Sequence, residues 1–518
     1  MNDVTPRAGR REWIGLAALA LATLAVSFDI FVLLLALPRL STELGASSTE
    51  QLWIVDIYGF MVGGLLITMG SLGDRVGRKK LLLAGAALFA VASLAGAYSV
   101  SPGMLIAARA LLGVAGATLA PSTLSLISNM FRDDRQRAMA IGVWGSCFTA
   151  GAIIGPIAGG LMLEHYWWGS VFLLGVPAMA LLLAVGPAAV PEYRTPRPGR
   201  MDLASVALSM LAVLPAVYGV KELARHGWQP LPLLALVAGV AVGAVFLRRQ
   251  RTLADPLLDL SLFRHTTLTT PLVGGLLYTM LTGATLVFVT QYFQSVIGLS
   301  PLQAALGMIP GLAVGTVAML AVPVIARRVG PGRLIGAGLV VVVVGLGVLA
   351  VVDPSWGAAG PVLGFAVWSA GGAPLLALGM HLIVGSAPPE KAGSASSLTQ
   401  VSSEFGYALG VAVIGTVGTA VYRAGLTLPA GTPAAAAGPA YENVAGAVAT
   451  AEGLGAPGLL AAAREAFTTA LNSVAGLSAV VLAAVAVVLT VRLRHLPPLG
   501  GGRQDEPAPR EPAGAGRD

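Results

Sequence analysis

The sequence predicts an all-α polytopic membrane protein, and two observations carry this prediction. Of its 518 residues, 56% are hydrophobic and only 11% are charged, and the mean hydropathy is +0.80. A soluble domain carries about 25% charged residues, so the composition excludes a soluble fold. In addition, apolar segments of the roughly 20 residues that cross a bilayer recur along the whole chain.

Fourteen apolar segments are the expected transmembrane helices. The first is too long and too interrupted by polar residues for a cleaved signal peptide, so we expect it to remain as a helix. The expected spans are 13–37, 51–70, 81–99, 104–130, 138–163, 168–190, 201–222, 231–248, 268–294, 303–326, 333–352, 359–385, 398–422 and 470–493.

Basic residues predict the orientation of these helices. The short segment between the second and third spans holds Arg75, Arg78, Lys79 and Lys80, and Lys and Arg collect in cytoplasmic loops. Most of the 32 Lys and Arg residues fall on this side, together with both ends of the chain. We therefore expect a protein of the bacterial cytoplasmic membrane with both termini cytoplasmic. The basic residues expected on the external side are Arg39, Lys221, Arg225, Arg423 and Arg464.

Two segments break the pattern of short loops between the spans. A tail rich in Pro, Gly and charge is expected to be disordered, and one long external connection is expected to carry a short helix around Glu442 to Leu460. The N-terminus (1–12) and the tail (495–518) are expected to be cytoplasmic, and the long connection is the external loop 423–469.

Few ionisable side chains lie inside the spans, and these are the candidate site residues. A charge at the centre of a bilayer costs at least about 2.5–3.5 kcal/mol, so the charges that remain there are functional candidates. Three are carboxylates, Asp29, Asp56 and Glu404, which can take up a proton or pair with a cation. Gln400 lies one helical turn from Glu404. Arg109 is the only cation expected inside a span.

Some of these residues also have a plainer interpretation. Asp29 could make a structural hydrogen bond to a neighbouring helix. Asp56 is nearer the outer boundary and could be hydrated there. Arg109 cannot lose its proton and must find a carboxylate, carbonyl groups or water, but near the outer end of its helix it could instead extend to the interface.

The segment 70–80 is predicted to form a two-residue turn between two spans. Its glycines allow close backbone approach, and its aspartate can cap a helix or pair with arginine. The plainer interpretation is a basic anchor with no part in transport. The residues concerned are Gly70, Gly73, Asp74, Arg75, Gly77 and Arg78.

The fifth span carries small residues every four positions, which let another helix approach closely. Its proline removes a backbone hydrogen bond, so we expect this helix to kink. Ordinary packing explains the glycines alone, and the proline makes the pattern more specific. The residues are Gly151, Gly155, Pro156, Gly159 and Gly160.

Aromatic side chains in several spans can line an apolar cavity suited to flat lipophilic cations. Lipid contact or core packing is the alternative for each of them. The candidates are Trp53, Trp144, Phe148 and Tyr292.

Several classes of function are excluded by what the sequence lacks. Its one cysteine, Cys147, lies in an apolar span, so neither a disulfide framework nor a Cys/His metal site is expected. No nucleophile–base pair or phosphate-binding loop appears, so we expect neither an enzyme nor ATP drive. The net charge of +7 arises from small groups between the spans, so nucleic acid is not an expected partner.

Together these segments resemble the major facilitator superfamily, specifically its fourteen-helix branch of drug:proton antiporters. The segments that carry the resemblance are 29–38, 51–58, 70–80, 109–116 and the Gly155-Pro156 pair. The resemblance implies a 6+2+6 arrangement, with two six-helix bundles (13–190 and 268–494) joined by two linker helices (201–249). In this fold the bundles hold a substrate near the membrane midplane and expose it alternately to each side. By the same resemblance, Asp29 and Asp56 match carboxylates used for proton coupling and cation binding, and Glu404 matches an acidic position of the thirteenth helix.

The chain departs from the antiseptic exporters of that branch, because three positions that carry carboxylates in some relatives are neutral here. Two positive centres generally need two desolvated partners, so monovalent cations or less charged amphipathic antibiotics are expected. The neutral positions are Gly315, Thr399 and Gln400.

The expected function is export of lipophilic, often cationic drugs or antibiotics in exchange for protons. The proton-motive force drives this export, without a cofactor or a metal. The expected partners are these drugs, protons and membrane lipids, and the expected state is a monomer. An alternative is a dedicated exporter of one endogenous antibiotic. A membrane sensor without transport is less favoured, because the chain shows no soluble signalling domain.

Overall fold

The computed structural model describes residues 8–131, 133–194, 202–253, 256, 266–386, 392–429 and 433–498. Fourteen of its helices are long and apolar enough to cross a membrane, which confirms the predicted all-α, fourteen-span fold. The elements are α1 (Arg10–Leu44), α2 (Ser48–Val76), α3 (Arg78–Ala97), α4 (Pro102–Met130), α5 (Asp134–His165), η1 (Trp168–Gly175), α6 (Val176–Ala189), α7 (Leu203–His226), α8 (Pro230–Thr252), α9 (Thr266–Gln291), η3 (Tyr292–Val296), α10 (Pro301–Ala326), α11 (Pro331–Leu349), η4 (Pro354–Trp356), α12 (Ala359–Gly385), α13 (Ala392–Gly425), α14 (Ala434–Glu442), α15 (Val444–Leu454) and α16 (Pro457–Leu493).

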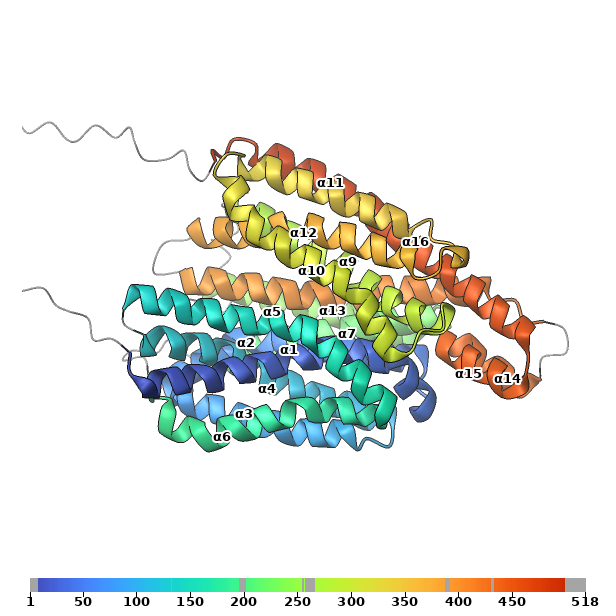
Figure 1. The fold of residues 1–518 in the computed structure, drawn as a ribbon, viewed down its shortest axis with the longest axis horizontal. Helices are drawn as coiled ribbons and strands as arrows, with labels where there is room; N and C mark the ends of the chain where they lie inside the picture. Colours follow the sequence, from blue (N-terminus) through green and yellow to red (C-terminus); the bar gives the residue numbers. More distant parts are fainter. Residues whose placement is uncertain are drawn as a thin grey trace, which may run out of the picture.

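The helices form two bundles and a linker pair. In Figure 1, α1, α3 and α6 of the first bundle lie below α10, α11 and α12 of the second. The first six spans pack mainly as α1 on α5, α2 on α4 and α3 on α4, and the last six as α11 on α12, α9 on α13 and α11 on α16. The linker helices α7 and α8 pack on each other. The two bundles meet where α2 contacts α13 and where α5 contacts α10, and α7 packs against both α2 and α13. The linker pair therefore lies beside the contact between the bundles.

The two ends of the molecule differ in the segments that they carry. At one end, Arg11 and Lys79 donate hydrogen bonds of 2.8 and 2.7 Å to carbonyl groups in the last turn of α6. The two described ends of the chain lie there as well (Figure 1), and we call this the basic end. The opposite end carries α14 and α15, and we call it the α15 end.

The connection between α13 and α16 is more helical than the sequence predicts. Because α13 continues to Gly425 and α16 begins at Pro457, the expected loop 423–469 is reduced to α14, α15 and their turns. The short helix that the sequence predicts there corresponds to α15. Alanine, the strongest helix former, is abundant in this segment, and the Asn443 side chain accepts the N–H of Gly446 and caps α15.

The linker helices are joined at the basic end by a charged cap. Asp202 precedes α7, and its carboxylate accepts the N–H of Ser205 at 3.1 Å. Arg249 of α8 donates to the same carboxylate at 2.9 and 3.1 Å. The hydrogen bond from Arg249 lowers the pKa of Asp202 to about 2, so this pair stays charged throughout the physiological pH range.

The segment 70–80 is helical except at one residue. Because α2 runs to Val76 and α3 begins at Arg78, Gly77 alone makes the turn, where two residues were predicted. The predicted pairing within the segment is confirmed, since Arg78 forms an ion pair with Asp74 at 2.6 Å. The other residues of the motif, Gly70, Gly73 and Arg75, lie inside α2.

Gly77 has a backbone conformation that other residues avoid. Its φ is +116°, and a β-carbon there would lie 2.5 Å from a carboxylate oxygen of Glu192. The same oxygen accepts the N–H of Lys79 at 3.1 Å, at the start of α3. Glycine therefore allows both the sharp turn and the close approach of the segment that follows α6.

The glycines of α5 allow two other helices to approach closely. A β-carbon at Gly151, Gly155 or Gly159 would lie 2.7, 3.2 or 2.3 Å from a side chain of α1, and one at Gly160 would lie 2.7 Å from the backbone of α10. The helix continues through Pro156. The motif therefore packs α5 against α1 of its own bundle and against α10 of the other bundle.

Gly77→Ala is expected to lower the free energy of unfolding by about 1–3 kcal/mol, because alanine is strained at this φ and meets the Glu192 carboxylate. Gly70→Ala is the matched control, since the space around this helical glycine is open. Thermal unfolding of the purified variants, followed by tryptophan fluorescence, measures both effects. An unchanged melting temperature for Gly77→Ala would show that the turn carries no such constraint.

Candidate functional site

A central cavity lies between the two bundles. Its volume is about 240 Å³, and residues of α1, α2, α4, α5, α9, α12 and α13 line it. A second cavity of about 390 Å³ shares Tyr58, Phe148 and Glu404 with the first, so the two adjoin. Sites for small molecules are mostly apolar cavities of roughly 300–1,000 Å³ with a few polar groups. Together the two cavities, which we call the central cavities, match this description.

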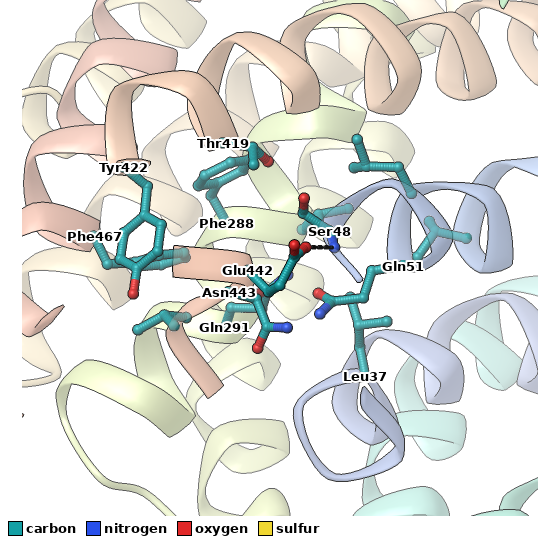
Figure 2. A pocket seen from close by; sticks show the side chains of 14 residues that line it. Leu37, Ser48, Gln51, Phe288, Gln291, Thr419, Tyr422, Glu442, Asn443 and Phe467 are labelled. Atoms are coloured by element: carbon teal, nitrogen blue, oxygen red, sulfur yellow. Dashed lines mark hydrogen bonds between the residues drawn. The ribbon is translucent and has the colours of Figure 1, made fainter. Parts of the chain in front are cut away.

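The hydrogen bonds that join the two bundles among the described residues lie at the α15 end. Gln294 donates to a carbonyl of α1 at 3.0 Å, and the hydroxyl of Ser300 contacts the carboxylate of Glu164. Figure 2 shows Glu442, at the end of α14, where its carboxylate accepts the N–H of Ser48 at 3.1 Å. The larger central cavity, by contrast, is lined by the early turns of α5 and α13, whose first residues lie toward the basic end. The central cavities are therefore closed at the α15 end and extend toward the basic end.

Arg109 is buried and neutralised in the cavity wall. Its guanidinium forms an ion pair with Asp29 of α1, and its Nε donates to the carbonyl of Ile54 at 3.1 Å. The ring of Tyr58 lies 4.8 Å away. The side chains of Arg109 and Asp29 are only 2% and 7% exposed. The interpretation that Arg109 extends to the interface is therefore wrong, and Asp29 serves as its counter-ion.

Asp56 is also paired, with a cation that the sequence analysis placed elsewhere. Lys221 of α7 lies 2.7 Å from Asp56, and both side chains are 0% exposed. The interpretation of Asp56 as hydrated is wrong, as is the placement of Lys221 on the external side and of Arg109 as the only cation in a span. The predicted span 201–222 already contained Lys221, and this was the signal for its burial.

Glu404 is the candidate carboxylate that has no cation partner among the described residues. It lines both central cavities and accepts a hydrogen bond at 3.0 Å from Gln400, one turn earlier on α13. Among the described residues that line these cavities, the charged ones are Arg109 and Glu404, and Arg109 is already neutralised by Asp29. An ionised Glu404 therefore gives the cavity wall one net negative charge, which can hold a proton or a cation.

Two of the four predicted aromatic residues line the central cavities, namely Trp144 and Phe148. Tyr292 is instead fully buried in the π-helical turn η3, and Trp53 lies with its ring centroid 4.0 Å from the ammonium of Lys221. The sequence shows the depth of an aromatic residue in a span but not the side of the helix on which it lies. The lining aromatic residues that sequence reasoning missed are Tyr58, Trp368 and Tyr407.

Comparison with known proteins decides the family. The sequence profile of the Major Facilitator Superfamily matches residues 19–411. The chain belongs to this superfamily. Its fold agrees with a solved structure of a bacterial homologue of the human lysosomal transporter Spinster, in an inward-facing and unoccupied conformation. The TM-score is 0.66 at 15% sequence identity, and the match covers 94% of this chain and 98% of that one.

Two curated relatives place the chain in a drug-exporter branch of the superfamily. The multidrug efflux pump LfrA of Mycolicibacterium smegmatis is 42% identical over 494 residues, which cover 95% of this chain and 98% of that protein. The methyl viologen resistance protein SmvA of Salmonella typhimurium is 34% identical over 471 residues, which cover 88% and 93%. The chain is therefore a multi-pass membrane transporter related to drug efflux pumps.

Asp29→Asn is expected to lower the free energy of unfolding by about 3–5 kcal/mol, because the buried guanidinium of Arg109 loses its carboxylate. Glu404→Gln is the matched control. It removes a carboxylate that makes a hydrogen bond but no ion pair, and should change the stability by less than about 1.5 kcal/mol. Denaturant unfolding in detergent measures both, and equal stability of Asp29→Asn and the parent would contradict the role of this pair.

Proposed function

We propose that this protein exports lipophilic, often cationic drugs in exchange for protons, and that drug and proton meet at Glu404. The observation that carries the proposal is that Glu404 lines both central cavities without a cation partner among the described residues, whereas Asp29 and Asp56 are held by buried cations. The efflux and resistance functions that the names of the two relatives state support the class of substrate.

Drug and proton compete for the same negative charge. A protonated Glu404 leaves the cavity neutral, and an ionised Glu404 attracts a cation, while Trp144, Phe148 and Tyr58 offer aromatic contact to it. Linkage requires that the proton and the drug weaken each other's binding by the same factor. When the cavity alternates between the two sides of the membrane, a proton moving inward therefore drives the drug outward.

The ion pair beside this site supports cation binding as well. Arg109 carries a permanent positive charge in the cavity wall, and Asp29 neutralises it. Without Asp29, Arg109 would repel a cationic drug and cancel the charge of Glu404. The pair therefore keeps Glu404 as the dominant charge that a bound drug meets.

The basic end is proposed to face the cytoplasm of a bacterial cell, because Lys and Arg collect on that side of a membrane. Both termini are then cytoplasmic, and the central cavities extend toward the side from which a drug is taken up. For release on the external side, the contacts at the α15 end must separate, among them the hydrogen bond between Ser48 and Glu442 (Figure 2).

One carboxylate without a cation suits a drug with one positive charge. A second charge would need a second desolvated partner, and Asp29 and Asp56 are already occupied by Arg109 and Lys221. We therefore expect the monovalent cations ethidium and tetraphenylphosphonium to be transported better than the dication methyl viologen.

Inside-out membrane vesicles with an imposed pH gradient, acidic inside, test the proposal. The parent should accumulate ethidium until an uncoupler is added. Glu404→Gln should reduce this uptake at least about tenfold, because losing a charged partner costs about 1.5–3 kcal/mol and each 1.4 kcal/mol is about tenfold.

Glu465→Gln, at an exposed glutamate of α16, is the matched control and should retain the uptake. Ethidium uptake by the parent that ignores the pH gradient would contradict proton coupling. Full uptake by Glu404→Gln would contradict the role of this carboxylate.

A further inference from the structure

We propose that Lys221 of the linker helix α7 controls the protonation of Asp56, and that protons enter from the α15 end where α2, α7 and α13 meet. This inference rests on the proposed proton-coupled export. The resemblance already offers Asp56 for proton coupling, and the inference assigns to this carboxylate, outside the central cavities, its own counter-ion. It also gives the two linker helices a part in transport.

The first support is the complete burial of the pair. Both side chains are inaccessible, and the ammonium of Lys221 lies 2.7 Å from the carboxylate of Asp56. Apart from this ion pair, no hydrogen bond from the described residues reaches the Asp56 oxygens or the Lys221 nitrogen. A buried pair costs several kcal/mol per ion in desolvation, so apolar side chains would join two helices at least as well. The pair therefore fits a group that changes its charge better than it fits a simple clamp.

Trp53 gives the ammonium of Lys221 a second partner. Its ring centroid lies 4.0 Å from this nitrogen, and a desolvated cation–π contact contributes about 2 kcal/mol. When Asp56 takes up a proton, the ion pair is lost but the contact with Trp53 remains. Lys221 can therefore stay charged through a cycle in which Asp56 gains and loses a proton.

Two small cavities with some hydroxyl groups in their linings lie between the α15 end and Lys221. One of them, of about 40 Å³, is lined by Ser48, Gln51 and Glu442 among others (Figure 2). It shares Ser48 and Thr419 with a second one of about 20 Å³, which Lys221 lines. A water needs about 10–15 Å³ and two to four polar partners, so each cavity has room for water beside hydroxyl groups. The proposed route for a proton therefore passes these cavities as far as Lys221, whose ammonium contacts Asp56.

Asp56 is also one helical turn from the central cavities. Gly59 follows it by three residues on the same face of α2. Gly59 packs against α13, where a β-carbon on it would lie 3.8 Å from the carboxylate of Glu404. A proton taken up at Asp56 is therefore near the group at which drug and proton are proposed to meet.

The charged groups around the pair come from several helices. On the outer side, the charges of Arg423 and Glu442 compensate each other at 3.4 Å. Toward the centre lies Glu404, and among the described residues Lys221 is the cation that contacts Asp56. The groups are Asp56 on α2, Lys221 and its chain neighbour Glu222 on α7, Glu404 and Arg423 on α13, and Glu442 on α14.

Loss of the ion pair affects the contact between the two bundles, which has to separate during transport. α7 packs against both α2 and α13, and these two helices form one of the contacts between the bundles. Protonation of Asp56 removes the charge interaction that holds α7 to α2. Proton uptake from the α15 end is thereby coupled to separation of the bundles at that end.

Three variants test this proposal in the same vesicles. Lys221→Met leaves Asp56 without a counter-ion, so the carboxyl group stays protonated through the cycle. In this variant, the uptake of ethidium that a pH gradient drives should fall at least tenfold. Exchange of ethidium across the membrane without a gradient should be retained. Lys221→Arg retains the charge and should regain gradient-driven uptake. The double variant Asp56→Asn/Lys221→Met should melt at the temperature of the parent but should not regain this uptake.

Arg249→Met is the matched control, because it removes a cation from the same helix pair without touching Asp56 or Lys221. It should retain gradient-driven uptake. Parent-like uptake by Lys221→Met would overturn the control of Asp56 by Lys221. Restored uptake in the double variant would show that the pair is only structural. A parent without gradient-driven uptake would instead overturn the proposed function itself.

Discussion

The cost of leaving a charge unpaired inside a membrane is the constraint on which this structure depends. It requires Arg109 to find Asp29 and Lys221 to find Asp56, and each pair joins helices that are distant in the sequence, α4 with α1 and α7 with α2. Once both cations are satisfied, one carboxylate, Glu404, is left facing the central cavities among the described residues. The pairing of charges thus selects the residue that is available for a proton or a drug.

Packing of small residues sets which contacts can change. The glycines of α5 hold this helix against α1 within one bundle, whereas Gly160 meets α10 of the other bundle. Rigid movement of the bundles would preserve the first contact and break the second. The hydrogen bonds of Gln294 and Glu442 across the α15 end belong to the same group of separable contacts. A tight interface within a bundle, and an interface between bundles that hydrogen bonds join at the α15 end, suit a protein that opens alternately at two ends.

Hydropathy predicts this fold well, because the length of an apolar segment directly reports a membrane crossing. Hydropathy does not predict which side of a helix faces a cavity. A helix that is apolar all round gives no sign of which side faces a cavity, so Trp53 and Tyr292 were expected in the cavity lining and Tyr407 was not. Lys221 was misplaced because a charge near the end of a span can lie on either side of the boundary, and only its partner, Asp56, fixes it inside.

The most direct test of the account is proton release on drug binding. The purified protein in weakly buffered detergent solution would be titrated with tetraphenylphosphonium while a pH indicator is followed. The account predicts that the parent releases up to about one proton per bound drug, because drug and proton compete for Glu404, and that Glu404→Gln releases none. Tight binding of the drug to the parent without any proton release, at every pH between about 5 and 8 where the protein is stable, would contradict it.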